Sequence, residues 1–202
     1  MKLVTRRGQP YEYHDEETGQ DFFSVTQIRT VMHNSYAGVS SEILEPARLR
    51  GQLLHTRFWK MLGARAGLCA MPPILHAYAG QCSAMDEWAE THQVTPITLE
   101  QKGVNRKLGY AGQTDTQCRY GVTRTITLAD LKTGQPTLTD PAQLLAYNCM
   151  EGFKSAQLLD LYVKADGTYE ERFVGLKERV AQWAPFLNAL NLLRWRRGQG
   201  VR

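Results

Sequence analysis

The chain has 202 residues, of which 43% are hydrophobic and 22% charged, and its formal net charge is +4. These proportions are ordinary for a globular protein and exclude a fibrous or disordered chain, and the length predicts one domain with extensions at both ends. No run of apolar residues approaches the roughly 18 that a transmembrane helix needs. The first 20 residues are rich in charge and lack an apolar segment, so we expect no secretory signal and no membrane partner.

Four cysteines, at positions 69, 82, 118 and 149, form no CxxC pair. A zinc site is therefore not expected. Because no secretory signal is expected, the thiols are predicted to stay reduced in a cytoplasm.

The positive charge is concentrated in two places. The segment from Pro46 to Ala84 contains no Asp or Glu, and neither do the last nine residues. Two basic patches on a nearly neutral chain indicate a local anion-binding surface, although arginines that only solvate helix faces would give the same pattern. The basic residues are Arg48, Arg50, Arg57, Lys60 and Arg65 in the first segment and Arg194, Arg196, Arg197 and Arg202 in the second.

The N-terminal half predicts a hairpin followed by helices. Turn residues separate two short β-prone runs, and Ser24 is placed to cap the helix that follows. The expected elements are strands Tyr11–His14 and Asp21–Phe23, a short helix Val25–Met32, a loop His33–Ser41, a long helix Glu42–Ala66, a connection Gly67–Gly80 and a helix Ala84–His92.

The middle of the chain is rich in Thr, Val, Ile and Tyr, which predicts three strands separated by turns. Gly103 and Asn105 are expected in the first turn and Gly121 in the second. The strands are Val94–Gln101, Leu108–Tyr120 and Arg124–Lys132.

The last third predicts a helix, a pair of strands and a final helix. These elements are Pro141–Phe153, Leu158–Lys164 with Tyr169–Val174, and Leu176–Trp195, whose apolar stripe is Leu176, Val180, Trp183, Leu187 and Leu190. The order of helix, three strands, helix and strand predicts an α/β fold around a small central mixed sheet.

Asp130 and Lys132 end a strand with an alternating pattern, Thr125–Leu128. Since side chains on a strand repeat with period two, both are expected on the same side. A carboxylate can bind a hard divalent cation while the neighbouring ammonium meets a phosphate or a water. A solvated ion pair would leave the same pattern.

Three further residues could join this pair. A hairpin turning at Gly121 would bring Asp115 opposite Asp130, and two facing carboxylates repel unless a cation lies between them. His55 lies on one flank of the long helix, where a neutral imidazole could complete a metal shell, and Glu100 could supply another oxygen. Each also has a simpler interpretation: a hydrated turn aspartate, a half-buried histidine and a surface acid.

Gln143 and Tyr147 are four residues apart and share one face of the next helix. Because apolar residues occupy the opposite face, both side chains are expected to point away from the helix's core side. They could contact phosphate, or they could form an ordinary polar helix face.

The C-terminal segment Leu192–Arg197 combines cations with an aromatic side chain. Trp195 could stack on an unpaired base while Arg194, Arg196 and Arg197 contact phosphates. A frayed helix end, whose dipole favours cations, is an equally compatible interpretation.

These motifs have a distinctive order along the chain. They are RGxxxH at Arg50–His55, then Glu100, GxxD at Gly112–Asp115, DxKTG at Asp130–Gly134 and QxxxY at Gln143–Tyr147. The series resembles the PD-(D/E)XK nuclease superfamily, in particular its RecB-like branch, which includes phage recombination exonucleases of the lambda type and CRISPR adaptation nucleases. The opening SVTQI at Ser24–Ile28 is also similar to that branch.

The resemblance covers roughly residues 24–165. It implies a restriction-endonuclease-like core at about 42–165, an N-terminal extension at 1–41, and a C-terminal hairpin strand and helix at 166–202. It also implies a metal-dependent deoxyribonuclease, with an exonuclease of phage-type recombination, replication or repair favoured. The cell would be bacterial or phage-infected. A homo-oligomer and a recombination or single-strand-binding partner are compatible with it.

The resemblance assigns a role to each candidate residue. Asp115 and Asp130 would bind Mg²⁺ or Mn²⁺. Lys132 would position or activate the attacking water and offset negative charge in the transition state. The remaining assignments are His55, the Leu131 carbonyl and Glu100 as further metal ligands, Gln143 and Tyr147 as phosphate contacts or braces, and Arg48 and Arg50 as DNA contacts.

Two departures and three alternatives accompany the resemblance. Thr114 stands where the family usually has a proline, and no cysteine follows Cys149, so the iron–sulfur cluster of some members is not expected. A catalytically inactive DNA-binding module of the same fold, a structure-specific endonuclease, and a regulatory protein whose arginines bind an acidic partner are the alternatives. There is no GxxxxGK[ST] motif, so ATP use is not expected.

Overall fold

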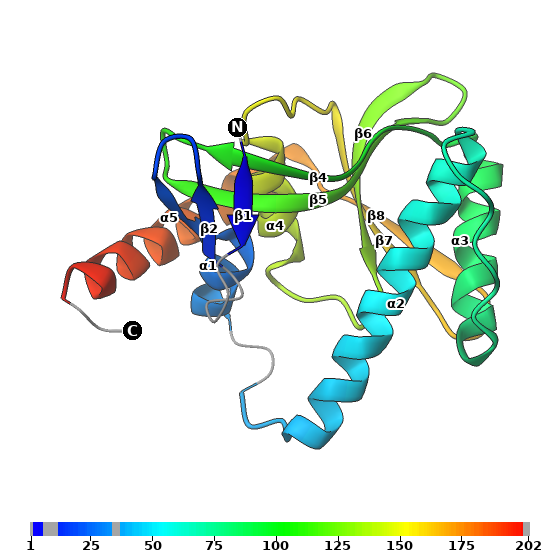
Figure 1. The fold of residues 1–202 in the computed structure, drawn as a ribbon, viewed down its shortest axis with the longest axis horizontal. Coiled ribbons are helices and arrows are strands. Elements are labelled where there is room, and N and C mark those ends of the chain that lie inside the picture. The colour runs from blue at the N-terminus through cyan, green and yellow to red at the C-terminus, as the bar shows by residue number, and fades with distance from the viewer. Residues whose placement is uncertain (1, 6–11, 34–36, 200–202) are drawn as a thin grey trace.

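The fold is α/β, with helices on both faces of one mixed sheet (Figure 1). The computed structural model describes residues 2–5, 12–33 and 37–199. In chain order the elements are β1 (Leu3–Thr5), β2 (Glu12–Asp15), β3 (Asp21–Ser24), α1 (Val25–Met32), α2 (Ser41–Arg65), a 3₁₀ turn (His76–Tyr78), α3 (Ala79–Thr91), β4 (Thr95–Asn105), β5 (Tyr110–Tyr120), β6 (Thr125–Lys132), α4 (Asp140–Asn148), β7 (Gln157–Val163), β8 (Tyr169–Phe173) and α5 (Leu176–Gly198).

The expected core order is confirmed. One helix (α2), three strands (β4, β5 and β6), one helix (α4) and one strand (β7) follow one another, with α3 inserted after α2. Within the described residues, the strands form one sheet in the order β1-β2-β3-β5-β6-β7-β8, and β4 pairs with the other edge of β5. None of the described helices is both long and apolar enough to cross a lipid bilayer.

The sheet is split along one edge of β5. At the start of this strand, Tyr110 and Ala111 pair in parallel with β3, and at its end residues 116–120 pair antiparallel with β6. Between the two, residues 112–115 face neither strand in the ladder. An interruption of this kind leaves backbone groups for side chains to satisfy, and it makes room for polar residues inside the fold.

Two hydrophobic clusters cover the two faces of the sheet. On one face α1, α4 and α5 pack against β5, β6 and β7, with Leu128 and Leu158 from the strands. On the other face α2 and α3 pack on the neighbouring positions, including Leu131 and Leu161. Since side chains alternate along each strand, β6 contributes to both cores from successive residues.

Only the second half of α2 belongs to the core. The predicted apolar positions Leu54, Phe58, Met61 and Leu62 are all buried. The first half carries exposed apolar side chains, among them Leu49, and Figure 1 shows it projecting from the body of the molecule.

The N-terminal hairpin and helix agree with the sequence. The Ser24 hydroxyl accepts a hydrogen bond from the Gln27 backbone N–H at 3.0 Å, and the Gln27 side chain accepts one from the Ser24 N–H at 2.9 Å. This reciprocal cap fixes the start of α1. Tyr11, the first residue of the expected hairpin strand, lies outside the described residues. Strand β1 was not expected, because three residues carry too little pattern.

Three expectations about local structure were wrong. Gly103 and Asn105 lie within β4 and not in a turn. A Cβ at Gly103 would come within 2.7 Å of the Phe153 ring, so the glycine is needed for close packing against that ring. Helix α4 ends at Asn148, whose side chain accepts a hydrogen bond from the Ser155 N–H at 2.7 Å and ties the following turn.

The third concerns the ends and the apolar stripe of the remaining helices. Helix α3 begins at Ala79, where Gly80 packs on the Ala165 carbonyl, and not at Ala84. On α5, Leu176 and Val180 are 76% and 69% exposed. The predicted stripe fails there because α5 packs on α1 and α4 only farther along, through its buried residues Phe186, Ala189 and Leu190.

Candidate active site

Asp115 lies where β5 and β6 separate. The last pair in their ladder is Thr116 with Ala129, so Asp115 and Asp130 occupy the next facing positions, as the hairpin predicted. The Leu131 backbone N–H donates to Asp115 Oδ2 at 2.7 Å. The carboxylate thus accepts the hydrogen bond that a backbone carbonyl of β5 would accept from Leu131 if the ladder continued.

Asp130 and Lys132 point to the same side of β6. Lys132 Nζ lies 2.6 Å from Asp130 Oδ2 and donates to Gln143 Oε1 at 2.7 Å. Two more carboxylates, Asp140 and Asp160, each lie 3.6 Å from the same nitrogen. These carboxylates outweigh the effect of burial and raise the pKa of Lys132 above its usual value. The side chain therefore stays protonated.

His55 reaches the site from the buried half of α2. Its Nδ1 lies 3.0 Å from Asp115 Oδ1. Burial lowers the pKa of His55, but the Asp115 carboxylate more than offsets this and raises that pKa to about 9. The imidazole is thus held as a cation beside the carboxylate.

The two facing carboxylates differ in how they are stabilised. Burial would raise the pKa of Asp115, yet the contacts with His55 and the Leu131 N–H lower it. The pKa of Asp130 is raised by burial and by the charge of Asp115, although Lys132 opposes this. The anionic form of Asp130 is therefore less favoured than that of Asp115, and an additional cation would stabilise it.

Asp160 was missed by the sequence analysis. It is fully buried on β7, in register with Asp130, and neither of its carboxylate oxygens has a hydrogen-bond partner. Burial raises its pKa to about 7, against the opposing charge of Lys132. The available signal was a single acid in the apolar run Leu158–Val163. A lone charge in a buried strand is rare unless it is paired or functional.

A second missed group ties the N-terminal helix to the site. Arg29 on α1 donates to Asp140 Oδ1 at 2.7 Å and also hydrogen-bonds Gln143 Oε1. Asp140 is buried. Its carboxylate accepts hydrogen bonds from the Thr137 N–H at 2.8 Å and from the Tyr162 hydroxyl at 2.9 Å. Burial would raise the pKa of Asp140, but Lys132 and these contacts lower it. No sequence signal pointed to Arg29.

Gln143 and Tyr147 correct one expectation. They do not face away from the core: both are buried, and Tyr147 belongs to the core beside β5. The Gln143 amide donates to the Tyr147 hydroxyl at 2.9 Å. The Tyr147 ring lies against the split in the sheet, where a Cβ on Gly112 would come within 2.5 Å of it. Gln143 contacts Lys132 directly, and Tyr147 is linked to Lys132 through the Gln143 side chain.

Glu100 lies at the margin of the site on β4. Its carboxylate accepts a hydrogen bond from the Gln113 side chain. Burial and the charge of Asp115 raise its pKa. Its φ of 50° places it in the left-handed region, which is strained for a non-glycine residue.

The donors suit a hard divalent cation in their chemistry. Asp115, Asp130, the Leu131 carbonyl and a deprotonated His55 would offer oxygen and nitrogen ligands of the kind Mg²⁺ or Mn²⁺ takes. In the part of the chain that the structure describes, however, no three His, Cys, Asp or Glu side chains converge in a ready metal cage. Asp115 is paired with His55 and Asp130 with Lys132. These two cations already neutralise the carboxylates that a metal ion would bind.

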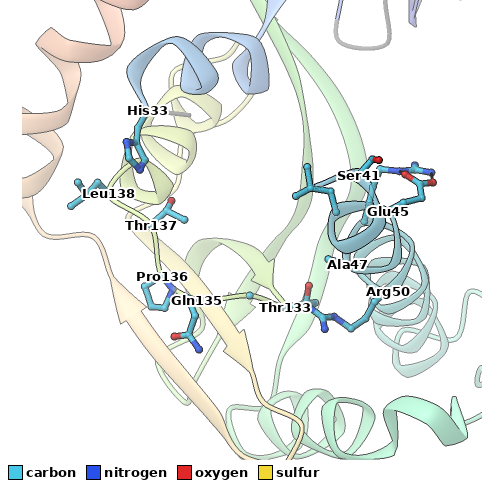
Figure 2. A pocket seen from close by; sticks show the side chains of 14 residues that line it. His33, Ser41, Glu45, Ala47, Arg50, Thr133, Gln135, Pro136, Thr137 and Leu138 are labelled. Carbon is cyan, nitrogen blue, oxygen red and sulfur yellow. Dashed lines mark hydrogen bonds and ion pairs between the residues drawn. The ribbon is translucent and has the colours of Figure 1, made fainter. Parts of the chain in front are cut away.

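Two adjoining cavities open at this site. One of about 360 Å³ is lined by Asp115, Asp130 and Lys132. The other, of about 960 Å³, lies between α2 and the loop 133–138 (Figure 2). Arg48 and Arg50, from the first basic segment, line the larger cavity. Arg48 also pairs with Glu45, donating from Nε at 2.9 Å.

The C-terminal basic residues lie elsewhere. Arg197 pairs with Asp21 of β3 at 3.0 Å, and Arg194 donates a hydrogen bond to the Leu108 carbonyl in the turn between β4 and β5. Trp195, at 62% exposure, and Arg196 face solvent. None of these four residues lines the cavity at the carboxylates.

Comparison with known proteins gives structural overlaps only. No family model and no curated protein matches the chain. The crystal structure of SSO0001 overlaps with a TM-score of 0.42 at 16% identity, over 84% of this chain and 72% of that one. An alkaline exonuclease (LHK-Exo) from Laribacter hongkongensis overlaps with a TM-score of 0.40 at 11% identity, over 88% of this chain and 94% of that one. Overlaps at this level are too weak to assign an activity to this chain. The function proposed below is therefore argued from the residues of the chain itself.

Proposed function

We propose that this chain is a metal-dependent DNA nuclease that hydrolyses phosphodiester bonds. One observation carries the proposal: Asp115, Asp130 and Lys132, which come from two strands, share one cavity that opens to solvent. The PD-(D/E)XK resemblance requires this set together, and a degenerate DNA-binding module has no need to keep it. An acidic partner for the arginines would not explain two facing carboxylates.

Each residue has a role in the proposed reaction. Asp115 and Asp130 would hold Mg²⁺ or Mn²⁺, with the Leu131 carbonyl and His55 beside them. A bound divalent cation supplies polarisation of the scissile phosphate and a lower pKa for the attacking water. His55 must release its proton to join, since only a neutral imidazole is a ligand.

Lys132 acts as a charge and not as a base. Its pKa is raised, so the ammonium keeps its protons and cannot accept one from water. It can donate to the attacking water or to a phosphate oxygen, and it offsets the charge that develops there. Gln143 accepts a hydrogen bond from Lys132 Nζ and is itself held by Arg29 and Tyr147. It therefore fixes the position of the ammonium beside Asp130.

Within this class we propose an exonuclease of phage-type recombination, replication or repair. The test is incubation with end-labelled linear DNA and with closed circular DNA, in Mg²⁺, in Mn²⁺ and in EDTA. Metal-dependent loss of linear DNA alone supports an exonuclease, and loss of both forms indicates an endonuclease. DNA binding with no cleavage under any condition would support the inactive binding module instead.

A further inference from the structure

The cavity at the carboxylates is the end of a longer trough. It shares Thr133, Gly134, Gln135 and Thr137 with the 960 Å³ cavity beside α2. That cavity in turn shares His33 and Leu138 with a third, of about 490 Å³, between α1 and α5. Shared lining residues place the three cavities next to one another in a row.

The far wall of the trough is one face of α5. Gln182, Pro185, Asn188 and Leu192 line the third cavity, at helical intervals of three and four residues. The next positions on that face are Trp195 and Arg196. They extend the wall beyond the cavity itself.

Beyond the cavity that Asp115, Asp130 and Asp140 line, the described residues lining the trough are positive or neutral except for Glu45. The loop from Thr133 to Thr139 and the chain from Arg179 onward contain no Asp or Glu. Arg48 and Arg50 line its middle, and Glu45, an acid in the same lining, pairs with Arg48. A polyanion laid along this path meets cations near the carboxylates, in the middle and at the far end.

Apolar side chains are exposed along the same path. Leu138 is 76% exposed, Leu192 38% and Trp195 62%. Exposed apolar and aromatic groups interleaved with cations suit the flat faces of unpaired bases, which stack while their phosphates meet the cations. A duplex keeps those faces inside, so it could not use them.

We propose that this trough binds a single strand of DNA that leads away from the cleavage site, with Trp195 as a stacking platform at its far end. The inference rests on the proposed nuclease function for its direction. It adds an extended binding site on α5 and commits the bound nucleic acid to single-stranded DNA.

The test separates binding from cleavage. Affinity for a fluorescent oligonucleotide of about 20 nucleotides, and for a tetranucleotide, is measured in EDTA, where no cleavage occurs. Trp195→Ala removes the platform and Trp195→Phe keeps a ring. Asn188→Asp puts a negative charge in the trough, and Val122→Asp, the control, puts the same charge on the exposed β5–β6 turn, which lines none of the three cavities.

We expect Trp195→Ala and Asn188→Asp to weaken binding of the long strand about tenfold, a typical loss for one stacked base. Trp195→Phe and Val122→Asp should bind like the wild type, and a duplex of equal length should not distinguish the variants. Unchanged affinity of both trough variants for the long strand overturns the inference. Wild-type protein that binds in this manner but cleaves nothing in Mn²⁺ would overturn the nuclease function and leave the trough in place.

Discussion

At the scale of single residues, Lys132 balances the charges of the site. It lies among Asp130, Asp140 and Asp160 and is 12% exposed. Removing one partner of a buried ion pair costs about 3–5 kcal/mol, because the other charge stays buried. We therefore expect Lys132→Met to lower the free energy of unfolding by roughly that amount at pH 8.

The loss in free energy of unfolding caused by Lys132→Met should be smaller at pH 5 than at pH 8. Asp130 and Asp160 have raised pKa values and take up protons as the pH falls, so they then need no ammonium. Urea unfolding of Lys132→Met and wild type at both pH values measures this. An equal loss at pH 5 and pH 8 would mean that the lysine does not compensate these carboxylates.

Asp160 gives a second pH prediction. Its pKa is about 7 in the folded chain, against an ordinary value of 3.8 for an aspartate. Between those values the native state holds a proton that the unfolded chain has released, so this group lowers stability as the pH rises. Asp160→Asn should therefore gain stability relative to wild type from pH 4 to pH 8, on the order of 2–4 kcal/mol in EDTA.

A matched control is Asp166→Asn, on the exposed β7–β8 turn. Hydrogen bonds from Thr168 lower the pKa of Asp166, so this change should give no gain over the same range. If thermal unfolding shows the same change in stability for Asp160→Asn and Asp166→Asn, the pKa of the Asp160 carboxyl is not raised.

His55 links metal affinity to pH. Because its pKa is about 9, a metal that takes up the imidazole must displace a proton. We expect the apparent affinity for Mn²⁺ to rise about tenfold per pH unit between pH 6 and pH 8. Isothermal titration calorimetry measures it, and His55→Gln should flatten the slope. An affinity independent of pH in the wild type would remove His55 from the ligands.

At the scale of elements, the fit between α4 and β5 positions the lysine. Gly112 lets the Tyr147 ring lie against the split in the sheet, and a Cβ there would come within 2.5 Å of that ring. Gly112→Ala should push Tyr147 and its partner Gln143 away from Lys132. We expect a loss of about 1–3 kcal/mol in stability and a lower rate of cleavage at saturating DNA.

The matched control is Gly175→Ala, at the start of α5. A Cβ there meets nothing within 4 Å, and its φ of −72° suits any residue. Because Gly175 is the N-cap of α5, alanine there should lower stability by about 0.5–1 kcal/mol, but Gly175→Ala should keep the wild-type rate of cleavage. If Gly112→Ala does the same, the tyrosine is not held against this strand.

The sequence predicted the elements where one pattern dominates. Helix α1, the buried half of α2 and strands β5 to β7 were correct within a few residues, because caps and periodicity mark them. Gly103 was misread because a glycine needed for close packing is indistinguishable, in sequence, from a turn glycine. The stripe of α5 failed at Leu176 and Val180, since periodicity does not say where a partner ends.

The candidate site divides in the same way. Asp115, Asp130 and Lys132 were predictable from strand alternation and a hairpin, which are local rules. Arg29 and Asp160 were not, because one lies 103 residues before Lys132 and the other depends on a parallel pairing. Such contacts are set by the tertiary fold and leave little local pattern.

At the scale of the whole molecule, the two basic segments have different roles. The first lines the trough beside α2 through Arg48 and Arg50. In the second, Arg194 contacts the β4–β5 turn and Arg197 contacts β3, whereas Trp195 and Arg196 are exposed. The C-terminal helix thus combines cations that hold it to the protein with an exposed aromatic and an exposed cation.

The most direct measurement is the rate of Mn²⁺-dependent cleavage of linear DNA by wild type and by Asp130→Asn. Asn keeps the shape of the side chain and removes the charge, and circular dichroism verifies that the variant folds. Asp166→Asn, purified in parallel, controls for the effect of an Asp→Asn change as such, and the activity left in Asp130→Asn sets the upper limit for a contaminating nuclease. The account predicts cleavage by wild type and Asp166→Asn, abolished by EDTA, and a fall of about a thousandfold in Asp130→Asn. Cleavage by folded Asp130→Asn at the wild-type rate would contradict it.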